Sequence, residues 1–388
     1  MVQLNRPHIG IFGRMNVGKS SLINALSGQQ VALVSPQAGT TTDPVKKTME
    51  ILGIGPVVLI DTAGIDDTSV LGEQRVKKTE EIFEQIDLAI LVFAQEFGRQ
   101  EQETVDLFRR RNIPFVCVHN KQDLFPQVAV PEGILALEFS CARGDNTGEI
   151  LRYIANALPK SAFASTGILD GYVHKNDEVV LVIPIDASAP AGRLILPQVQ
   201  TIRNLLDIGA AAVCVKDTEL ADYLQHHTPT LVVTDSQAFA TVNAIVPQNI
   251  PLTSFSILFS RVKGDFEAYL AGTRAISRLR DGDKVLMMES CSHSVNKCDD
   301  IGRTKIPNWL RKCTGKKLSF DILSHLDPLP EDVQKYKLAV QCGGCMVTRI
   351  QILRRLEALK QKGVPVSNYG LTIAYCTGIF ERATELFK

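Results

Sequence analysis

The sequence predicts an α/β protein with more than one domain, and three observations support this prediction. The chain has 388 residues, which exceeds the roughly 100–200 residues expected of one domain. Short apolar runs, such as residues 57–60 and 90–93, alternate with segments that have helical apolar spacing. A glycine-containing stretch at residues 13–20 follows an apolar run and precedes a helical one, which is the element order of an α/β domain.

The composition is that of a balanced globular protein. The 42 Lys and Arg residues match 42 Asp and Glu residues, so no global field favours nucleic acid or a membrane as a partner. The longest apolar runs, at residues 179–185 and 211–215, are far shorter than the roughly 20 residues that span a bilayer. No leader-like pattern precedes the first apolar run, so we expect a cytoplasmic protein. Nine cysteines in a reducing compartment then indicate metal binding or catalysis rather than disulfides.

The sequence GRMNVGKS at residues 13–20 matches the phosphate-binding P-loop pattern. In this pattern backbone amides surround the phosphates, Lys19 reaches the β- and γ-phosphates, and the Ser20 hydroxyl binds Mg²⁺. Residues 61–64 read DTAG after an apolar strand. Asp61 can therefore bind Mg²⁺ through water, and the Gly64 amide can sense the γ-phosphate. We expect residues 1–165 to form a nucleotide-binding G domain.

A second group of residues indicates which base this domain binds. Residues 120–123 read NKQD directly after an expected strand. The Asp123 carboxylate can accept hydrogen bonds from N1–H and the 2-amino group of guanine, which adenine does not offer, so we expect GTP. The predicted nucleotide-binding residues are Asn16, Val17, Gly18, Lys19, Ser20, Ser21, Asp61, Gly64, Asn120, Lys121, Asp123, Ser140, Cys141 and Ala142.

These motifs resemble the TrmE–Era branch of GTPases, with Asn16 in the P-loop and the sequence AGTTTD at residues 38–43 as matching positions. The resemblance implies that Asn16 helps bind K⁺ and that Thr41 completes the Mg²⁺ shell. Lys19, Thr41 and Gly64 are then the expected catalytic residues. Ile65 stands where Ras-like proteins place a water-orienting glutamine, so the resemblance implies slow GTP hydrolysis that K⁺ stimulates.

Residues 166–264 are expected to form a small, mostly parallel α/β domain. The expected strands cover residues 179–185, 211–215, 230–234 and 251–255, and the expected helices cover residues 194–206, 220–225 and 238–244. No glycine-rich phosphate loop occurs in this segment, so we expect it to serve homodimerisation rather than chemistry. Cys214 is expected to be a buried small hydrophobe, and His226 with His227 to lie at a surface helix end.

The last segment, residues 265–388, contains Cys291-Ser-His293 and the CxxC pair Cys342 and Cys345. Strands expected at residues 284–288 and 337–340 end just before these motifs, so two strand ends can bring three thiols together. Thiolates select zinc or an iron–sulfur cluster, and zinc would take Cys291, His293, Cys342 and Cys345 as a Cys₃His set. The residues alone leave zinc, a cluster and unliganded thiols open.

Three further cysteines lie in the same segment. Cys298 and Cys313 fall in a lysine-rich stretch that we expect to be a loop, where they are alternate ligands or plain thiols. Cys376 falls in the apolar stretch at residues 371–376 and is expected to lie in the core. A helix with amphipathic spacing is expected at residues 347–359, so its N-terminal dipole would favour thiolate at the CxxC pair.

The complete layout resembles the HydF family, the maturation GTPases of [FeFe]-hydrogenases, over essentially the whole chain. The resemblance implies that Cys291, Cys342 and Cys345 hold a [4Fe–4S] cluster with one labile iron position, and His293 matches the family's first half-motif. Gln341 stands where the family has a second histidine. A neutral amide is a poor iron ligand beside three thiolates, which leaves His293, water or an exogenous ligand for the fourth position.

This resemblance implies a GTP-hydrolysing scaffold that carries the di-iron subcluster to apo-[FeFe]-hydrogenase as transient cargo. The implied partners are a second copy of the chain, the apo-hydrogenase and the radical-SAM hydrogenase maturases. A rival prediction is a tRNA-modification or ribosome-assembly GTPase with a structural zinc domain. The rival requires a basic RNA-binding face, and no basic, aromatic-interleaved stretch is evident in the sequence.

Overall fold

The computed structural model describes two compact units, one spanning Asn5–Phe163 and one spanning Ala164–Lys388. Within them it describes every residue except 1–6, 28–44, 52–54, 63–81, 84, 145, 160–166, 186–191, 193, 291–300, 325–326 and 345–346. We call them the N-terminal and the C-terminal unit. The division into domains at residues 1–165, 166–264 and 265–388 stays a prediction.

A six-stranded sheet forms the centre of the N-terminal unit, in the strand order β2-β3-β1-β4-β5-β6. Its strands are β1 (His8–Phe12), β2 (Val45–Ile51), β3 (Gly55–Asp61), β4 (Leu88–Phe93), β5 (Phe115–His119) and β6 (Ala136–Glu138). Only β2 runs antiparallel to its neighbour; the other pairs are parallel. All six residues of β4 are buried, as expected of a central strand covered on both faces.

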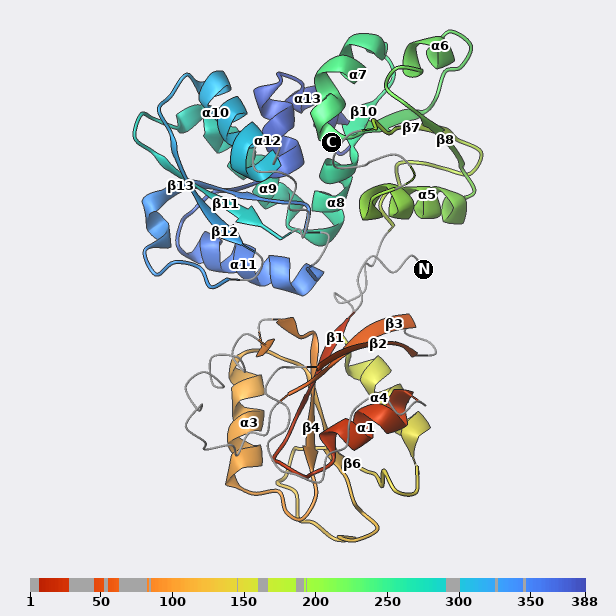
Figure 1. Ribbon diagram of the computed structural model, residues 1–388, viewed down its shortest axis with the longest axis vertical. Coiled ribbons are helices and arrows are strands. Elements are labelled where there is room, and N and C mark those ends of the chain that lie inside the picture. The colour runs from red at the N-terminus through yellow and green to blue at the C-terminus, as the bar shows by residue number, and fades with distance from the viewer. Residues whose placement is uncertain are drawn as a thin grey trace. The chain divides into compact units, whose positions relative to one another are not determined.

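Helices cover both faces of this sheet, as Figure 1 shows: α3 (Arg99–Arg110) lies on one side, and α1 (Lys19–Ser27) and α4 (Thr147–Ala157) lie on the other. The apolar side of α3 packs on the sheet, where the Phe108 ring lies 5.3 Å from that of Phe12. The prediction of an α/β domain in this part of the chain is confirmed.

A four-stranded parallel sheet opens the C-terminal unit, in the order β10-β9-β7-β8. Its strands are β7 (Glu178–Val182), β8 (Ala211–Val215), β9 (Leu231–Thr234) and β10 (Leu252–Ser254). The helices between and after them are α5 (Leu196–Ile208), α6 (Leu220–Leu224), α7 (Phe239–Ile245) and α8 (Phe255–Lys263). The predicted small parallel α/β arrangement is confirmed.

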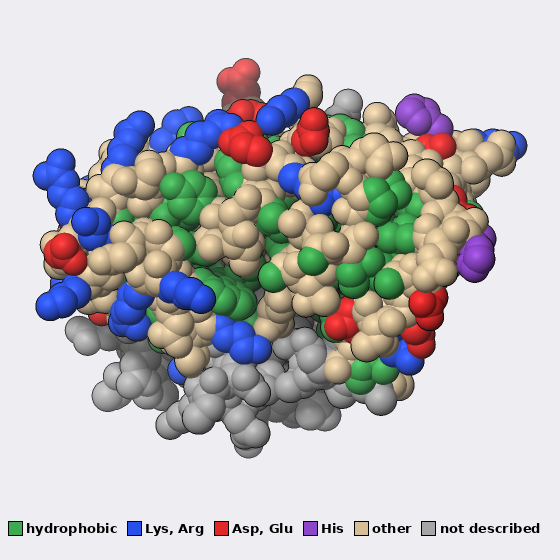
Figure 2. All heavy atoms as spheres, turned by 90° about the horizontal axis from the view of Figure 1, so that it is seen from above, with side chains coloured by type: hydrophobic (Ala, Val, Ile, Leu, Met, Phe, Trp, Pro, Cys, Tyr) green, Lys and Arg blue, Asp and Glu red, His purple; other side chains and the backbone are tan. Residues whose placement is uncertain are grey.

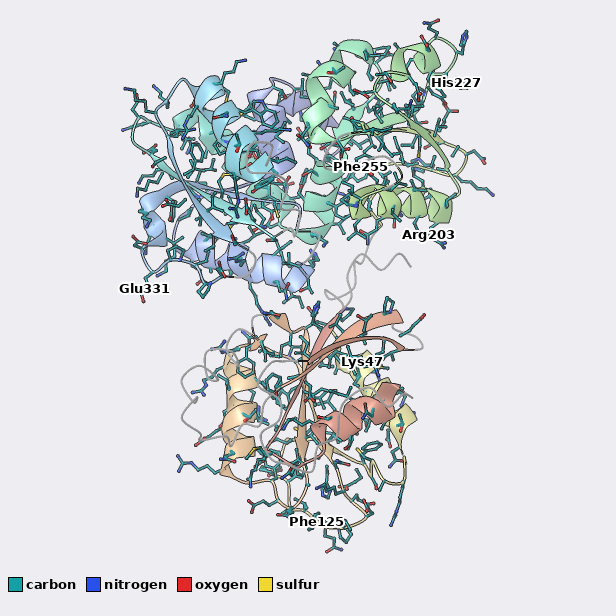
Figure 3. All side chains as sticks on the ribbon, in the orientation of Figure 1. Lys47, Phe125, Arg203, His227, Phe255 and Glu331 are labelled. Carbon is teal, nitrogen blue, oxygen red and sulfur yellow. The ribbon has the colours of Figure 1, made fainter. Side chains whose placement is uncertain are left out.

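The prediction that Cys214 is buried is wrong, because its thiol is exposed. Cys214 lies on β8, which is an edge strand and therefore has no neighbouring strand on one side. His226 and His227 follow the short helix α6 and are exposed, as expected. Figure 3 shows His227 at the margin of the unit, and its ring stacks on Tyr223 at 4.2 Å.

A second four-stranded parallel sheet follows, in the order β12-β11-β13-β14. Its strands are β11 (Lys284–Glu289), β12 (Ser319–Ser324), β13 (Tyr336–Gln341) and β14 (Val366–Asn368). The associated helices are α9 (Phe266–Arg274), α10 (Ile306–Thr314), α11 (Arg349–Gln361), α12 (Tyr369–Cys376) and α13 (Phe380–Glu385). In Figure 1, α11 lies on one face of this sheet, and α10 and α12 lie on the other.

The prediction that Cys313 lies in a loop is wrong, since it is on α10. Pro307 stands in the first turn of this helix, where proline is tolerated, and Ile306 and Leu310 form its buried side. Arg311 and Lys312, in the last turn of the helix, are exposed. Figure 2 shows Lys and Arg side chains gathered over part of the surface. Exposed basic residues in this half of the unit include Arg311, Lys312, Lys317, Lys335 and Lys337.

The two sheets of the C-terminal unit share one hydrophobic core, which includes Val180 and Val232 from the first sheet and Met287 and Leu338 from the second. Polar contacts also join them. Arg382 on α13 donates to Asn243 Oδ1 at 2.7 Å and to the Pro247 carbonyl at 2.6 Å. Phe255, labelled in Figure 3, is fully packed where α8 begins. No helix in the described part of either unit is long and apolar enough to cross a membrane.

Candidate functional site

The P-loop connects β1 to α1 in the N-terminal unit. Gly18 has φ +95°, and a Cβ atom at this position would collide with the Asn120 side chain. Glycine is therefore required for the loop to approach the segment that follows β5. Two motifs that are a hundred residues apart in the sequence thus meet at one edge of the sheet.

Lys19, Ser20 and Asp61 lie together at the carboxyl ends of β1 and β3. Lys19 Nζ donates to the carbonyls of Gly13 at 2.9 Å and Arg14 at 2.8 Å, within its own loop. Ser20 Oγ donates to Asp61 Oδ2 at 2.6 Å. The second carboxylate oxygen, Asp61 Oδ1, is buried and accepts no hydrogen bond from the residues that the structure describes. A hydroxyl and a carboxylate with a spare buried oxygen suit Mg²⁺, which takes oxygen ligands.

Burial raises the pKa of Asp61, although the Ser20 hydrogen bond and the charge of Lys19 oppose this. Burial therefore destabilises the ionised form of Asp61, and a bound cation would offset this destabilisation.

Asn120 and Lys121 connect the base-recognition motif to the P-loop. The Asn120 amide donates to the Val17 carbonyl at 2.8 Å and accepts from the Cys141 amide at 3.1 Å. Lys121 Nζ donates to the Asn16 carbonyl at 2.7 Å. Asn120 is 1% exposed, so this bridge is built into the core of the unit.

Asp123 is held by Ser140, whose hydroxyl donates to Asp123 Oδ1 at 2.6 Å. This hydrogen bond lowers the pKa of Asp123, so its carboxylate is ionised at neutral pH. Ser140, Cys141 and Ala142 follow β6, which places them beside the residues that follow β5. The structure brings together the predicted base-binding residues; Thr41 and Gly64 lie outside the described residues, and Ser21 is on α1.

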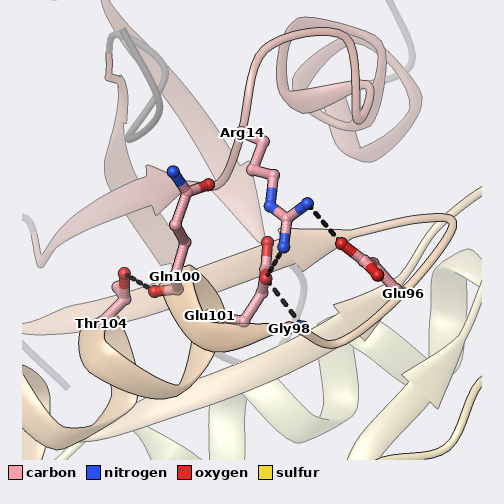
Figure 4. Close-up of polar contacts among 6 residues, drawn as sticks. All are labelled: Arg14, Glu96, Gly98, Gln100, Glu101 and Thr104. Carbon is pink, nitrogen blue, oxygen red and sulfur yellow. Dashed lines mark hydrogen bonds and ion pairs between the residues drawn. The ribbon is translucent and has the colours of Figure 1, made fainter. Parts of the chain in front are cut away.

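A contact that sequence reasoning missed anchors the P-loop to α3 (Figure 4). Arg14 donates to Glu101 at 2.6 Å and to Glu96 at 2.8 Å, and Glu101 also accepts from the Gly98 amide at 2.9 Å. Glu101 is 1% exposed. A buried carboxylate bound to a P-loop arginine fixes the loop against the start of the helix. The only signal in the sequence is a charged residue at a variable P-loop position, which identifies no partner.

A second candidate site surrounds Cys342 in the C-terminal unit. β11 and β13 are neighbouring parallel strands, so the segments that follow them, with Ser290 and Cys342, lie side by side. The Cys342 thiol is 4% exposed. Its sulfur accepts from the Ser290 amide at 2.9 Å, the Gly344 amide at 3.4 Å and Gln341 Nε2 at 3.9 Å.

Hydrogen bonds donated to a sulfur favour its thiolate form and tune a metal bound to it. This donor set around Cys342 therefore fits a metal–thiolate centre. Cys291, His293 and Cys345, which sequence reasoning placed in the same centre, lie outside the described residues, as does Cys298. The residues described contain no cluster of three or more metal-binding side chains. Cys313 contacts Cys376 instead, as described below.

Gln341 is buried directly beside this thiol. Its Nε2 donates to Ser290 Oγ at 3.1 Å and to the Cys342 carbonyl at 3.2 Å. Its Oε1 is buried and accepts no hydrogen bond within the described part of the chain. Asn368 Nδ2, at the start of α12, donates to the Gln341 carbonyl at 3.3 Å. The Gln341 amide is thus oriented with its donor side toward the thiol, and an acceptor remains without a partner.

Lys263, at the end of α8, holds the loop that follows Cys342. Its Nζ donates to the Gly344 carbonyl at 2.6 Å and to the Val347 carbonyl at 3.1 Å, and the residue is 2% exposed. Gly344 has φ +66°, which permits this turn of the backbone. Sequence reasoning missed Lys263, because it lies far from the CxxC pair and no motif contains it.

Tyr269 on α9 is also close enough to Cys342 to respond to its charge. Burial raises the pKa of the Tyr269 phenol, and the Cys342 thiolate adds to this effect. The phenol therefore stays protonated.

The helix α11 begins shortly after Cys342, and Thr348 caps its N-terminus. Thr348 Oγ1 accepts from the Gln351 amide at 3.3 Å.

Comparison with known proteins identifies three matching family models. Residues 8–121 match a 50S ribosome-binding GTPase model, residues 168–264 the hydrogen maturase F dimerization domain, and residues 267–386 the hydrogen maturase F tetramerization domain. The GTPase match covers the P-loop and Asp61. The tetramerization-domain match covers Cys342 and Gln341.

Each of two curated relatives matches less than half of the chain. The tRNA modification GTPase MnmE of Nitrosomonas europaea is 44% identical over 117 residues, which is 30% of this chain and 26% of that protein. MnmE of Prochlorococcus marinus is 35% identical over 171 residues, or 42% of this chain and 36% of that protein. The chain therefore spans between about a quarter and a third of the length of these relatives.

Two solved structures each cover 40% of the chain. An Era variant of Aquifex aeolicus bound to GDP and AlF₄⁻ has 28% identity and a TM-score of 0.36, covering 40% of this chain and 57% of that one. The FeoB G domain of Methanococcus jannaschii has 17% identity and a TM-score of 0.31, covering 40% of this chain and 98% of that one.

The N-terminal unit is thus a GTPase domain. The dimerization-domain and tetramerization-domain models match adjacent segments that together make up more than half of the chain, so the chain belongs to the hydrogen maturase F family.

Proposed function

We propose that this chain is a GTP-hydrolysing maturation factor that carries the di-iron subcluster of [FeFe]-hydrogenase and delivers it to the apo-enzyme. Membership of the hydrogen maturase F family supports this role. The main structural support is the Cys342 thiol, which is buried among N–H donors at the adjoining ends of β11 and β13. A GTPase domain on the same chain supplies a switch that can time the exchange of partners.

In the N-terminal unit, Lys19 would bind the β- and γ-phosphates, and Ser20, Asp61 and Thr41 would hold Mg²⁺. Asp123 would bind guanine, with Ser140 keeping its carboxylate oriented. The Gly64 amide would sense the γ-phosphate, and Asn16 would contribute to a K⁺ site. Because Ile65 cannot orient water, hydrolysis would be slow and K⁺ would raise its rate.

In the C-terminal unit, Cys291, Cys342 and Cys345 would hold a [4Fe–4S] cluster. When bound, this group supplies an iron with an exchangeable coordination position near which cargo can attach. Gln341 would support the thiolate through its amide donor, which is directed toward Cys342 and Ser290, and would not serve as a fourth ligand. His293, water or an exogenous ligand would fill that position. Lys263 would hold the loop between the two cysteines and the following helix.

The proposed partners follow from the family. The names of the two matching domain models support self-association, and we propose a homodimer as its smallest form. We further propose apo-[FeFe]-hydrogenase and the radical-SAM maturases as transient partners, in the cytoplasm, with no role for nucleic acid or a membrane. The rival function, a tRNA-modification or ribosome-assembly GTPase with a zinc domain, is supported by a relative that matches only 30% of this chain.

Anaerobic purification with metal analysis tests this proposal. We expect a brown protein with about four irons per chain, as a [4Fe–4S] cluster requires. The Cys342→Ala variant should lose most of this iron and should keep GTP hydrolysis, whereas Cys214→Ala, which removes an exposed thiol, should keep both. Iron-loaded protein should activate apo-hydrogenase in a purified maturation system. Stoichiometric zinc without visible absorption would instead support the rival function.

A further inference from the structure

Cys313 and Cys376 face each other on two packed helices of the C-terminal unit. Cys313 lies in the last turn of α10, and Cys376 is the last residue of α12. Their sulfur atoms are 2.8 Å apart. A covalent S–S bond measures about 2.05 Å, so bond formation requires the two sulfurs to approach by less than the width of an atom.

The two thiols differ in their access to solvent. Cys313 is exposed, whereas Cys376 is half-buried beneath it. The hydrogen bond from the Cys376 thiol lowers the pKa of Cys313. The same contact, together with burial, raises the pKa of Cys376. An outer thiol that ionises more readily and an inner thiol held against it are the two components that thiol–disulfide exchange requires.

We propose that Cys313 and Cys376 form a redox-active dithiol, a modification site separate from the Cys342 loop, which low-molecular-weight disulfides oxidise to an intramolecular disulfide. This proposal does not depend on the proposed function. It rests on the contact between the sulfurs and on the difference in their exposure.

The exchange takes place in two steps. The Cys313 thiolate attacks one sulfur of the small disulfide, which breaks that S–S bond, forms a mixed disulfide on Cys313 and releases one small thiolate. Cys376 then loses its proton to solvent and attacks the Cys313 sulfur, which releases the second small thiolate. The two protein thiols are oxidised by two electrons in total, and one small disulfide is reduced to two thiols.

The bond would tie together two elements that continue from the candidate cluster loop. α10 follows the short turn at Ile301–Lys305, directly after the segment that contains Cys291 and His293. α12 follows Asn368, whose side chain donates to the Gln341 carbonyl. Oxidation would therefore fix the far ends of both helices to each other and close a loop of 63 residues that contains β13 and α11. The separation of the cysteines in sequence predicts a higher unfolding temperature after oxidation, by roughly 5–10 °C.

Peptide mapping of the full chain tests the proposal. Reduced protein is treated anaerobically with glutathione disulfide, blocked with an alkylating agent and digested with trypsin. Cleavage after Lys312, Lys316, Lys362 and Arg382 leaves Cys313 and Cys376 on separate peptides that contain no other cysteine, and Cys342 on a third. We expect one linked peptide that joins Cys313 to Cys376, with no glutathione retained on either.

Two single variants separate the steps. Cys376→Ser should retain glutathione on Cys313, because no second thiol can displace it, and should show no rise in unfolding temperature. Cys313→Ser should leave Cys376 unmodified, because that thiol is half-buried. GTP hydrolysis and gel filtration check that each variant is folded. A wild-type protein that retains glutathione on Cys313, or that shows both thiols free after treatment, would overturn the proposal.

Discussion

Two lysines hold two glycine-containing loops in this protein, and they differ in how far along the chain they reach. Lys19 donates to the carbonyls of Gly13 and Arg14, six and five residues before it. Lys263 donates to the carbonyls of Gly344 and Val347, 81 and 84 residues after it. Both ammonium groups contact two backbone carbonyls, yet Lys19 is half-buried and Lys263 is 2% exposed.

This difference in exposure distinguishes a lysine that can bind a ligand from a lysine that only stabilises a loop. A half-buried lysine can exchange neutral carbonyl partners for phosphate oxygens, which form stronger, charge-assisted hydrogen bonds. A fully buried ammonium group cannot leave its carbonyls without leaving an unpaired charge in the core, so Lys263 holds the backbone at Gly344 and Val347. The nucleotide loop is thus built to receive a charged ligand, and the thiol loop is built to be held in one shape.

The largest effect is expected at Lys19, the lysine of the P-loop. Lys19→Ala should lower the rate of GTP hydrolysis by about 10²–10³-fold, the usual loss when one charge-stabilising donor is removed from a transition state. Phosphate release in the presence of Mg²⁺ and K⁺ measures it. Lys337→Ala, which removes an exposed lysine from β13, is the matched control and should hydrolyse GTP at the wild-type rate. GTP hydrolysis at the wild-type rate by Lys19→Ala would mean that Lys19 only stabilises its loop, as Lys263 does.

A smaller effect is expected at Lys263, the lysine that holds the loop after Cys342. Lys263→Met keeps the volume of the side chain but leaves the Gly344 and Val347 carbonyls without their donor, which costs about 1–3 kcal/mol of unfolding free energy. Urea unfolding followed by the fluorescence of Trp309, the single tryptophan of the chain, reports on the C-terminal unit alone.

The iron content of Lys263→Met should also fall, while GTP hydrolysis per folded molecule stays unchanged. Lys360→Met, on the exposed side of α11, is the control and should change neither quantity. Unaltered urea unfolding and iron content in Lys263→Met would contradict a supporting role.

The smallest expected effect concerns Asp61, a buried carboxylate of the nucleotide site. Burial raises its pKa in the folded protein. A carboxyl group with a raised pKa contributes stability that is complete below the unfolded pKa of about 4 and is lost as pH rises through the folded value. Wild-type protein without nucleotide or metal should therefore lose stability relative to Asp61→Asn as pH rises from 4 toward neutrality.

Calorimetry of both proteins at several pH values measures this difference. Asp106→Asn, which neutralises a half-exposed carboxylate on α3, should show no such trend. A constant difference between wild type and Asp61→Asn across the pH range would mean that Asp61 is not strained in the empty site.

Short-range sequence patterns determined most of the nucleotide site. Lys19 and Ser20 belong to one loop, and the residues that follow β5 read as a base-binding motif wherever they occur. The same holds for the parallel sheets, because strands that alternate with helices are joined by crossovers and so run parallel. The CxxC pair was equally visible, because two thiols three residues apart form a metal-binding pattern without reference to the rest of the fold.

Only the tertiary structure decided the contacts that join distant segments. That Ser290 donates to Cys342 follows from β11 and β13 being neighbours, and strand order is set by packing of the whole sheet. Cys214 is exposed because β8 lies at an edge, and Cys313 meets Cys376 because α10 packs on α12. Lys263 reaches Gly344 through a core shared by two sheets. A sequence records which groups need partners, but the folded core decides which partner each group receives.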